Sequence, residues 1–175
     1  MAAPSSLAFA VTAIFTLLGL VHVYWALGGR LGRGAALPQL PVPPGWQKHG
    51  EPAMVNAFNP GPALTLVVAA ALIAVGVAVA LRGGLFAAPV QHVALQAMLA
   101  AVALVMLARA IGDFRLVGFF KRVKGSAFAR MDTWVYSPLC VALGLGVGWM
   151  AIALSALSTD RAHAALSQYA RAIIE

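Results

Sequence analysis

The sequence predicts an all-α polytopic membrane protein: a bundle of four transmembrane helices with a proline-rich loop after the first and a short amphipathic C-terminal helix. Of the 175 residues, 62% are hydrophobic and only 10% are charged, whereas soluble proteins carry roughly 25% charged residues. The mean hydropathy is +0.88. Four apolar runs approach the ~20 residues that a spanning helix needs. Together these observations argue against a water-soluble globule.

The apolar runs are separated by segments rich in glycine, proline or charge. In lipid every backbone amide must be hydrogen-bonded internally, so each run is predicted to be a helix and the whole chain one membrane domain. The first run lacks a basic segment before it and is followed by Arg30 and Arg33, which favours a retained helix over a cleaved signal peptide. The predicted spans are residues 6–27, 63–81, 93–111 and 137–157.

The connection over residues 28–62 holds seven of the ten prolines, so it is not expected to form a long regular helix. Loops of this length are usually functional or disordered. Trp46 and Phe58 lie among the prolines, which favours a packed cap, and we expect an ordered lid. A second connection, residues 112–136, is basic. The segment 159–175 has the apolar and charged faces of an amphipathic helix at the membrane surface or under the bundle.

Charge predicts orientation and partners. The 12 basic and 5 acidic residues give a net charge of +7 and lie mostly in the connections, where basic residues set orientation and meet anionic head groups. Nine basic residues belong to the connections 28–62 and 112–136 together with Arg109, and three lie elsewhere. We therefore expect a multi-pass protein of the bacterial cytoplasmic (inner) membrane, with both long connections cytoplasmic and both termini periplasmic or exterior. Membrane lipids are expected partners, and nucleic acid is not.

Polar residues from four separate segments gather at the basic end of the predicted bundle, as a site at the mouth of a bundle requires. His22 stands out, because an imidazole late in an apolar helix must find a partner or stay neutral. It is either a proton carrier or ligand, or it bonds a head group or loop carbonyl. The candidate catalytic residues are His22, Asp113 and Asp132. The candidate ligand-binding residues are Trp25, His49, Glu51, Asn56, Arg109, Arg115, Trp134 and Tyr136.

Each candidate also has a structural interpretation. Arg109 and Asp113 are four residues apart on one predicted helix face, where they form an ion pair, or Arg109 reaches lipid phosphates or fixes an anionic ligand that Asp113 orients. The aromatic residues form either a belt at the head-group level or the wall of a pocket. Glu51 and Asp132 are either solvated loop acids or general acids and bases.

No cofactor or metal is predicted. Membrane bundles hold haem on paired histidines, but His22 and His92 fall at opposite faces of the bilayer in this topology, so a haem site needs His22 with His49. Metal binding by His22, His49 and Glu51 lacks a fixed ligand spacing. The single cysteine, Cys140, excludes an intramolecular disulfide and a CxxC redox pair.

Two segments, HVYWALGG at 22–29 and RAIGDFRLVGFFKRVKGSAFARMDTWVYSPLC at 109–140, resemble the bacterial membrane family known as domain of unknown function 3995. The resemblance extends from the first predicted helix to the fourth. It implies a compact four-helix integral membrane protein and carries no activity with it. The matching residues are His22, Trp25, Gly29, Arg109, Gly112, Asp113, Phe114, Arg115, Gly118, Phe119, Lys121, Asp132, Tyr136, Ser137 and Pro138.

The sequence therefore favours a small integral membrane protein that binds, or binds and transforms, a hydrophobic or amphiphilic small molecule: a lipid, an isoprenoid or a quinone-like compound. As an enzyme it would be a membrane-embedded acid/base catalyst, isomerase-like or lipid-modifying. His22 would then transfer protons, with Arg109 and Arg115 as anion anchors and Asp113 and Asp132 as orienting acids. The alternatives are a non-catalytic structural or accessory subunit of a larger membrane complex and, third, a small transporter. A membrane protein partner or a homo-oligomer stays open.

Overall fold

A computed structural model describes residues 3–43, 45 and 53–152 of the chain. Four of its helices are long and apolar enough to cross a membrane, which confirms the predicted multi-pass fold class. They are α1 (Ala3–Ala26), α3 (Pro62–Gly83), α4 (Val93–Ile111) and a helix over Ala127–Ile152, here called the 127–152 helix, which begins as α5 (Ala127–Met131) and η1 (Asp132–Tyr136).

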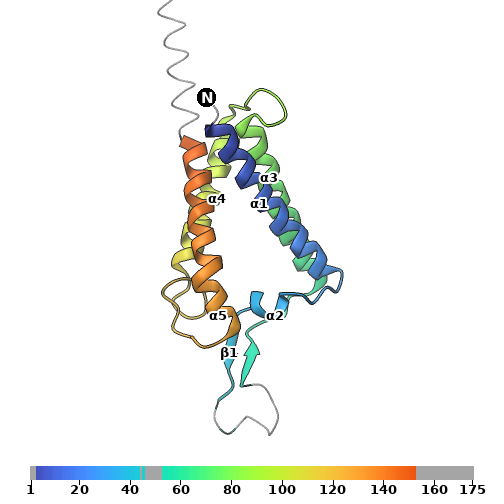
Figure 1. Ribbon diagram of the computed structural model, residues 1–175, viewed down its shortest axis with the longest axis vertical. Coiled ribbons are helices and arrows are strands. Elements are labelled where there is room, and N and C mark those ends of the chain that lie inside the picture. Colours follow the sequence, from blue (N-terminus) through green and yellow to red (C-terminus); the bar gives the residue numbers. More distant parts are fainter. Residues whose placement is uncertain (1–2, 44, 46–52, 153–175) are drawn as a thin grey trace, which may run out of the picture.

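The helices form two pairs that meet at one end and diverge toward the other (Figure 1). Small residues let α1 and α3 approach closely along their length, as is common between membrane helices. Thr12 Oγ1 donates a hydrogen bond to the carbonyl of Gly76 at 3.2 Å, and a Cβ on Gly83 would overlap Ala8. The buried core takes residues from all four helices and includes Ala8, Val11, Phe15, Val79, Leu99, Val147 and Met150.

Glycine and proline set the ends of α3. The helix begins with Pro62 directly after Gly61, where the missing proline N–H would have no helical partner in any case. Gly84 caps its C-terminus: its φ of 69° is left-handed, and its N–H donates to the carbonyls of Ala80 and Leu81.

The described part of the connection 28–62 caps the diverging end. The short helix α2 (Arg33–Ala36) lies across the opening between the two helix pairs (Figure 1). Beyond it, β1 (Gln39–Pro41) and β2 (Met54–Asn56) pair antiparallel, with Leu40 opposite Val55. Trp46, which contributes to the expectation of a packed cap, lies outside the described residues.

Hydrogen bonds tie α2 to both helix pairs. Trp25 Nε1 on α1 donates to the carbonyl of Leu31 at 2.8 Å, and the Leu31 N–H donates to Tyr24 Oη at 3.3 Å. On the other side, Tyr136 Oη donates to the carbonyl of Ala35 at 3.3 Å. The cap is therefore fixed to α1 by two hydrogen bonds at Leu31, just before α2, and to the 127–152 helix by one at Ala35.

The fourth span differs from its predicted bounds, whereas the first three agree within a few residues. The helix begins at Ala127 rather than 137, so the last ten residues of the predicted basic connection are helical. Ser126 Oγ caps this start by accepting the Ala129 N–H at 3.0 Å. The end predicted at 157 and the segment 159–175 lie outside the described residues.

A π-helical turn carries the 127–152 helix past Pro138, which has no N–H to donate. In η1 the Ser137 N–H donates to the carbonyl of Asp132, five residues earlier. Such turns hold one residue more than an α-helical turn and often occur at functional sites.

Candidate functional site

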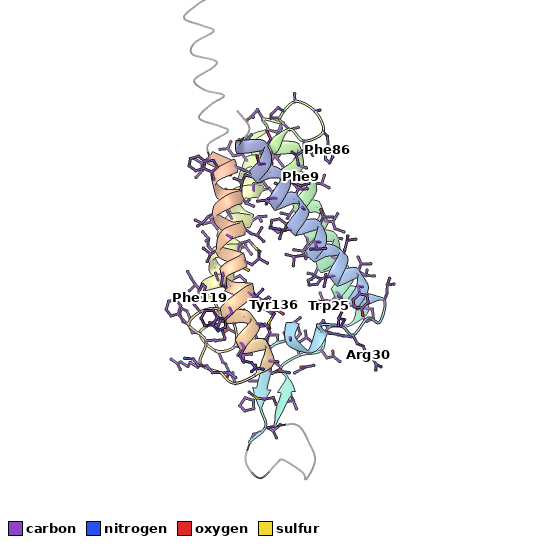
Figure 2. All side chains as sticks on the ribbon, viewed as in Figure 1. Phe9, Trp25, Arg30, Phe86, Phe119 and Tyr136 are labelled. Atoms are coloured by element: carbon purple, nitrogen blue, oxygen red, sulfur yellow. The ribbon has the colours of Figure 1, made fainter. Side chains whose placement is uncertain are left out.

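An inner cavity of about 400 Å³ lies between the two helix pairs and is bordered by Ala36 of α2. All four long helices and α2 contribute to its wall, which is mostly apolar. Figure 2 shows Trp25 and Tyr136 on opposite helix pairs, with Arg30 and Phe119 outside. The lining residues are Phe15, Leu18, His22, Trp25, Ala36, Val68, Leu72, Val105, Met106, Arg109, Phe128, Tyr136, Leu139, Cys140 and Leu143.

An apolar groove of about 410 Å³ between α3 and α4 continues the inner cavity. All of its lining residues are apolar, and the two cavities share the side chains of Phe15, Val68, Leu72, Val105 and Met106. The groove also reaches the outside of the bundle, since Val67 on its wall is 64% exposed. A hydrocarbon chain held in the groove would therefore border lipid.

A second cavity of about 260 Å³, here called the outer cavity, is lined by residues of α1, α2 and α3 and of the segment before α3. It shares His22, Trp25, Ala36 and Val68 with the inner cavity. Arg33 lines it and donates to Asn59 Oδ1 and to the carbonyl of Pro60, each at 3.3 Å. His22 thus belongs to the wall between a polar-rimmed compartment and the interior.

The hydrogen bond of His22 fixes its tautomer. Its Nδ1 lies 2.8 Å from the carbonyl oxygen of Leu18, and a carbonyl only accepts, so Nδ1 carries the hydrogen. In the neutral imidazole Nε2 then presents its lone pair. The Trp25 ring packs edge-on against His22 with centroids 5.0 Å apart and is itself held by its bond to Leu31. His22 is therefore an oriented hydrogen-bond acceptor at the inner cavity.

A buried charge cluster, here called the Asp132 cluster, closes the inner cavity near the end of α4. Asp132 is fully buried. Its Oδ1 accepts from Arg109 Nη2 at 2.8 Å, and its Oδ2 accepts from Lys121 Nζ at 3.0 Å and from the Gly118 N–H at 2.7 Å. Lys121 Nζ also donates to Thr133 Oγ1 at 2.6 Å. Two cations share one carboxylate, so the cluster keeps one positive charge.

Arg109 brings that charge to the cavity wall. Its Nη2 is bound to Asp132, but its Nη1 is buried without a hydrogen-bond partner among the residues that the structure describes. Leaving a buried donor unpaired costs on the order of 1–3 kcal/mol, and more for a charged group. Arg109 lines the inner cavity, and a small shift of its guanidinium would bring Nη1 to an oxygen atom bound there and remove this cost.

The ion pair between Arg109 and Asp113 that the four-residue spacing suggests is not formed. The helix ends at Ile111, and Gly112, with φ of 95°, turns the chain away. Asp113 Oδ1 instead accepts the N–H groups of Arg115, Leu116 and Val117 at 2.7–2.9 Å. Burial raises the pKa of Asp113, but these backbone donors outweigh it and the net pKa is lowered. Asp113 thus caps the loop as a carboxylate.

A protein-family model matches residues 15–147, a range that holds the inner cavity and the Asp132 cluster. The chain belongs to the family described as Protein of unknown function (DUF3995). The resemblance seen at residues 22–29 and 109–140 is thereby confirmed. A search of curated proteins and a search of solved structures each found no match. The DUF3995 assignment names no activity, so the function has to be argued from the geometry.

The structure brings four of the predicted site residues of this DUF3995 chain together and separates others from them. His22, Trp25, Arg109 and Tyr136 line the inner cavity, and Asp132 adjoins it through Arg109. Four others do not line it: Asp113, Arg115 and Asn56 are exposed, and Trp134, 80% exposed, borders a separate surface hollow. His49 and Glu51 lie outside the described residues.

Two residues of the DUF3995 site had no role in the sequence-based prediction. Lys121 lies in the basic run FFKRVKG, where a membrane-surface charge is the ordinary interpretation, yet it is buried in the Asp132 cluster. Cys140 lines the inner cavity one helical turn after Tyr136. That spacing is the sequence signal that could have placed Cys140 beside a predicted site residue.

For metal or haem, the described residues offer little. Among them, no three His, Cys, Asp or Glu side chains cluster. His22 lies near the cavity end of α1, whereas His92 caps the start of α4 at the opposite end by accepting the Ala94 N–H at 3.2 Å. These two histidines are therefore too far apart to hold one haem.

Proposed function

We propose that this DUF3995 protein binds an amphiphilic small molecule, with the polar head in the inner cavity and the hydrocarbon tail in the apolar groove. The observation that carries the proposal is the continuity of two chemistries. One part of the cavity wall holds the unpaired donor Arg109 Nη1 and the acceptor His22 Nε2. Another part of the wall is continuous with the all-apolar groove between α3 and α4.

The size of the two spaces supports a small ligand. Small-molecule pockets generally measure roughly 300–1,000 Å³, with mostly apolar walls and a few placed polar groups. The inner cavity, at about 400 Å³, and the groove, at about 410 Å³, lie near the lower end of that range. The ligand would reach the groove from the bilayer, because Val67 and Val105 on its wall are 64% and 59% exposed.

Any chemistry on the ligand would run through His22. Its Nε2 is the ring nitrogen left for acid/base chemistry, and Tyr136, which lines the same cavity from the opposite helix pair, is a candidate partner. Asp132 has both oxygens occupied and holds Arg109 in place. Asp113 serves the loop. These contacts give the two aspartates positioning and capping roles in our proposal, and leave proton transfer to His22.

We also propose that the protein lies in the inner membrane with the cavity end cytoplasmic. Among the described residues, the basic side chains exposed at that end include Arg30, Arg115, Arg122, Lys124 and Arg130. Arg82, at the opposite end, is buried and bonded to Gln91 Oε1 at 2.6 Å. Basic residues concentrate on the cytoplasmic side of bacterial membrane proteins. Lys121 does not count toward this asymmetry, because it is buried in the Asp132 cluster and not exposed at the membrane surface.

The test is to purify the full chain in mild detergent and identify co-purifying small molecules by native mass spectrometry. Val105→Trp fills the wall shared by cavity and groove without touching the Asp132 cluster, and Leu104→Trp is its control, since Leu104 is exposed and lines neither space. We expect one defined amphiphile on the wild type and on Leu104→Trp, and its loss from Val105→Trp and His22→Ala.

Equal amounts of bulk phospholipid on all four proteins, with no defined ligand, would overturn the proposal. In that case the accessory-subunit interpretation is favoured, and the next experiment is a search for the partner.

A further inference from the structure

We infer that the head group is a compact acid carried on a single chain, either a carboxylic acid or a phosphate monoester. The inference rests on the proposed function and narrows its ligand class. Three observations carry it: the excess charge of the Asp132 cluster, the pairing of one open donor with one open acceptor, and the size of the groove.

The charge argument favours an anion. Arg109 and Lys121 share the single carboxylate of Asp132, which leaves one uncompensated positive charge at the wall of the inner cavity. A net charge in a membrane-embedded, low-dielectric site is costly unless it is paired. No described carboxylate lines the cavity, so we assign the compensating negative charge to the ligand.

The same observation disfavours other head groups. A neutral alcohol or quinone leaves the positive charge of Arg109 uncompensated. A zwitterionic choline or ethanolamine head brings a second cation into a space where the described residues offer it no carboxylate. An acid both neutralises the cluster and has oxygens for Arg109 Nη1.

The hydrogen-bonding pattern matches an acid monoanion. A carboxylate or phosphate oxygen accepts from Arg109 Nη1. A phosphate monoester in its monoanionic form also keeps one O–H, which donates to His22 Nε2, the nitrogen left open by the bond from Nδ1 to Leu18. If that proton moves to Nε2, an imidazolium and a phosphate dianion result, no other bond changes, and the total charge of the site stays the same.

The single chain follows from the space beside the head. The groove that continues the inner cavity has a volume of about 410 Å³ and is bounded by α3, α4 and Phe15 of α1. This volume, near the lower end of the small-molecule range, suits one hydrocarbon chain. A phospholipid with two chains would have to leave one of them outside.

Cys140 provides the readout. It is the single cysteine of the chain and it lines the inner cavity, so its alkylation by a small maleimide reports occupancy without background. The experiment uses the delipidated full-length protein in detergent, with oleate and oleyl alcohol as competitors that differ only in the head group. We expect oleate to halve the alkylation rate at a concentration at least tenfold below that of oleyl alcohol.

Two variants test whether the preference for oleate over oleyl alcohol depends on the charge of the Asp132 cluster. Lys121→Met leaves Asp132 paired with Arg109 alone, so the cluster loses its surplus positive charge. The shape of the inner cavity is kept, because Lys121 does not line it. We expect this variant to reduce the oleate preference at least threefold. Arg122→Met removes an exposed charge from the same loop and should leave the preference unchanged. Farnesyl phosphate against farnesol extends the test to a phosphate monoester, and dioleoyl phosphatidate, with two chains, should protect at least tenfold more weakly than oleyl phosphate.

Two failures can be told apart. If oleyl alcohol protects Cys140 as well as oleate does, and Val105→Trp abolishes both effects, the cavity binds an amphiphile but the acid inference is wrong. If no competitor changes the alkylation rate of the wild type, the proposed function itself is overturned.

Discussion

Lys121 Nζ lies 3.0 Å from Asp132 Oδ2, and the two side chains are 2% and 0% exposed. The pair joins the loop after α4 to the start of the 127–152 helix, and the same carboxylate holds Arg109 from the end of α4. One buried acid thus fixes two basic residues from different segments. The position of Arg109 at the cavity wall therefore depends on a contact made away from the cavity.

The two partners of this pair should differ in their effect on stability. Asp132→Ala leaves the buried Lys121 and the partly buried Arg109 without their carboxylate, and breaking a buried pair by removing one partner costs on the order of 3–5 kcal/mol. Lys121→Met should cost less, because Arg109 and the Gly118 N–H still satisfy Asp132. Thermal unfolding in one detergent compares the two, with the exposed Arg122→Met as control. A larger loss for Lys121→Met than for Asp132→Ala would contradict this ranking.

Gly118 should tolerate no side chain. It has φ of 88°, and a Cβ there would overlap the carbonyl of Ile111 and the backbone of Gly112. Gly118→Ala should therefore give little folded protein and disturb the backbone donor to Asp132. Gly125→Ala is the matched control: its φ of 92° is as unusual, but nothing lies within 4 Å of the added Cβ. It should lose only about 1–2 kcal/mol of backbone preference.

A similar loss of folded protein in both glycine variants would show that the close approach of Ile111 is not the cause. The measurement is the yield of monodisperse protein together with its melting temperature.

The capping carboxylate of Asp113 should give a pH-dependent contribution to stability. Its folded-state pKa is lowered, so the contribution is present above the unfolded pKa, about 4, and is lost as the pH falls through the lower folded-state pKa. The melting temperatures of the wild type and Asp113→Ala should therefore differ at neutral pH and converge in acid. A difference that stays constant down to about pH 2.5 would contradict ionisation of this carboxylate as its source.

Tyr136→Phe should loosen the cap over the inner cavity. The change removes the hydrogen bond from Tyr136 Oη to the carbonyl of Ala35, which is worth about 0.5–1.5 kcal/mol, and keeps the ring. We expect a small loss of stability and faster alkylation of Cys140. Trp134→Phe, at an exposed position of the same turn, should leave the alkylation rate unchanged; equal acceleration in both variants would argue against a specific role of the Ala35 contact.

The proposed orientation is tested by single cysteines in a Cys140→Ser background. Phe86→Cys, in the exposed connection between α3 and α4, should react with a membrane-impermeant maleimide on spheroplasts. Arg122→Cys, at the basic end, should react only after permeabilisation. The opposite pattern would place the cavity end outside, and the Cys140→Ser parent gives the background.

The sequence was sufficient for the fold class and the first three spans, because an uninterrupted apolar run in lipid has few alternatives to a helix. The start of the fourth helix was missed because Asp132 and Arg130 make residues 127–136 look like a loop. The structure buries Asp132 against Arg109 and Lys121, so its charge is compatible with a helix. Ion pairs between residues of different segments cannot be predicted from their spacing along the chain.

The site was partly predictable for the same reason. His22, Trp25, Arg109 and Tyr136 each lie near the end of an apolar run, and parallel placement of those ends brings them together. Asp113 was assigned to Arg109 on helical spacing, which fails because Gly112 ends the helix one residue earlier. The burial of Lys121 was not predicted, because a lysine within a basic run ordinarily lies at the surface.

The divergence of the two helix pairs toward α2 (Figure 1) makes the protein wider in one leaflet than in the other. The chain therefore displaces unequal numbers of lipids from the two halves of the bilayer. If the inner cavity holds the proposed ligand, the ligand occupies the wide side only, and any change in the separation of the helix pairs on binding would change the area that the protein needs in that leaflet. Tension or lipid packing confined to that leaflet would then act on the same binding equilibrium as ligand concentration.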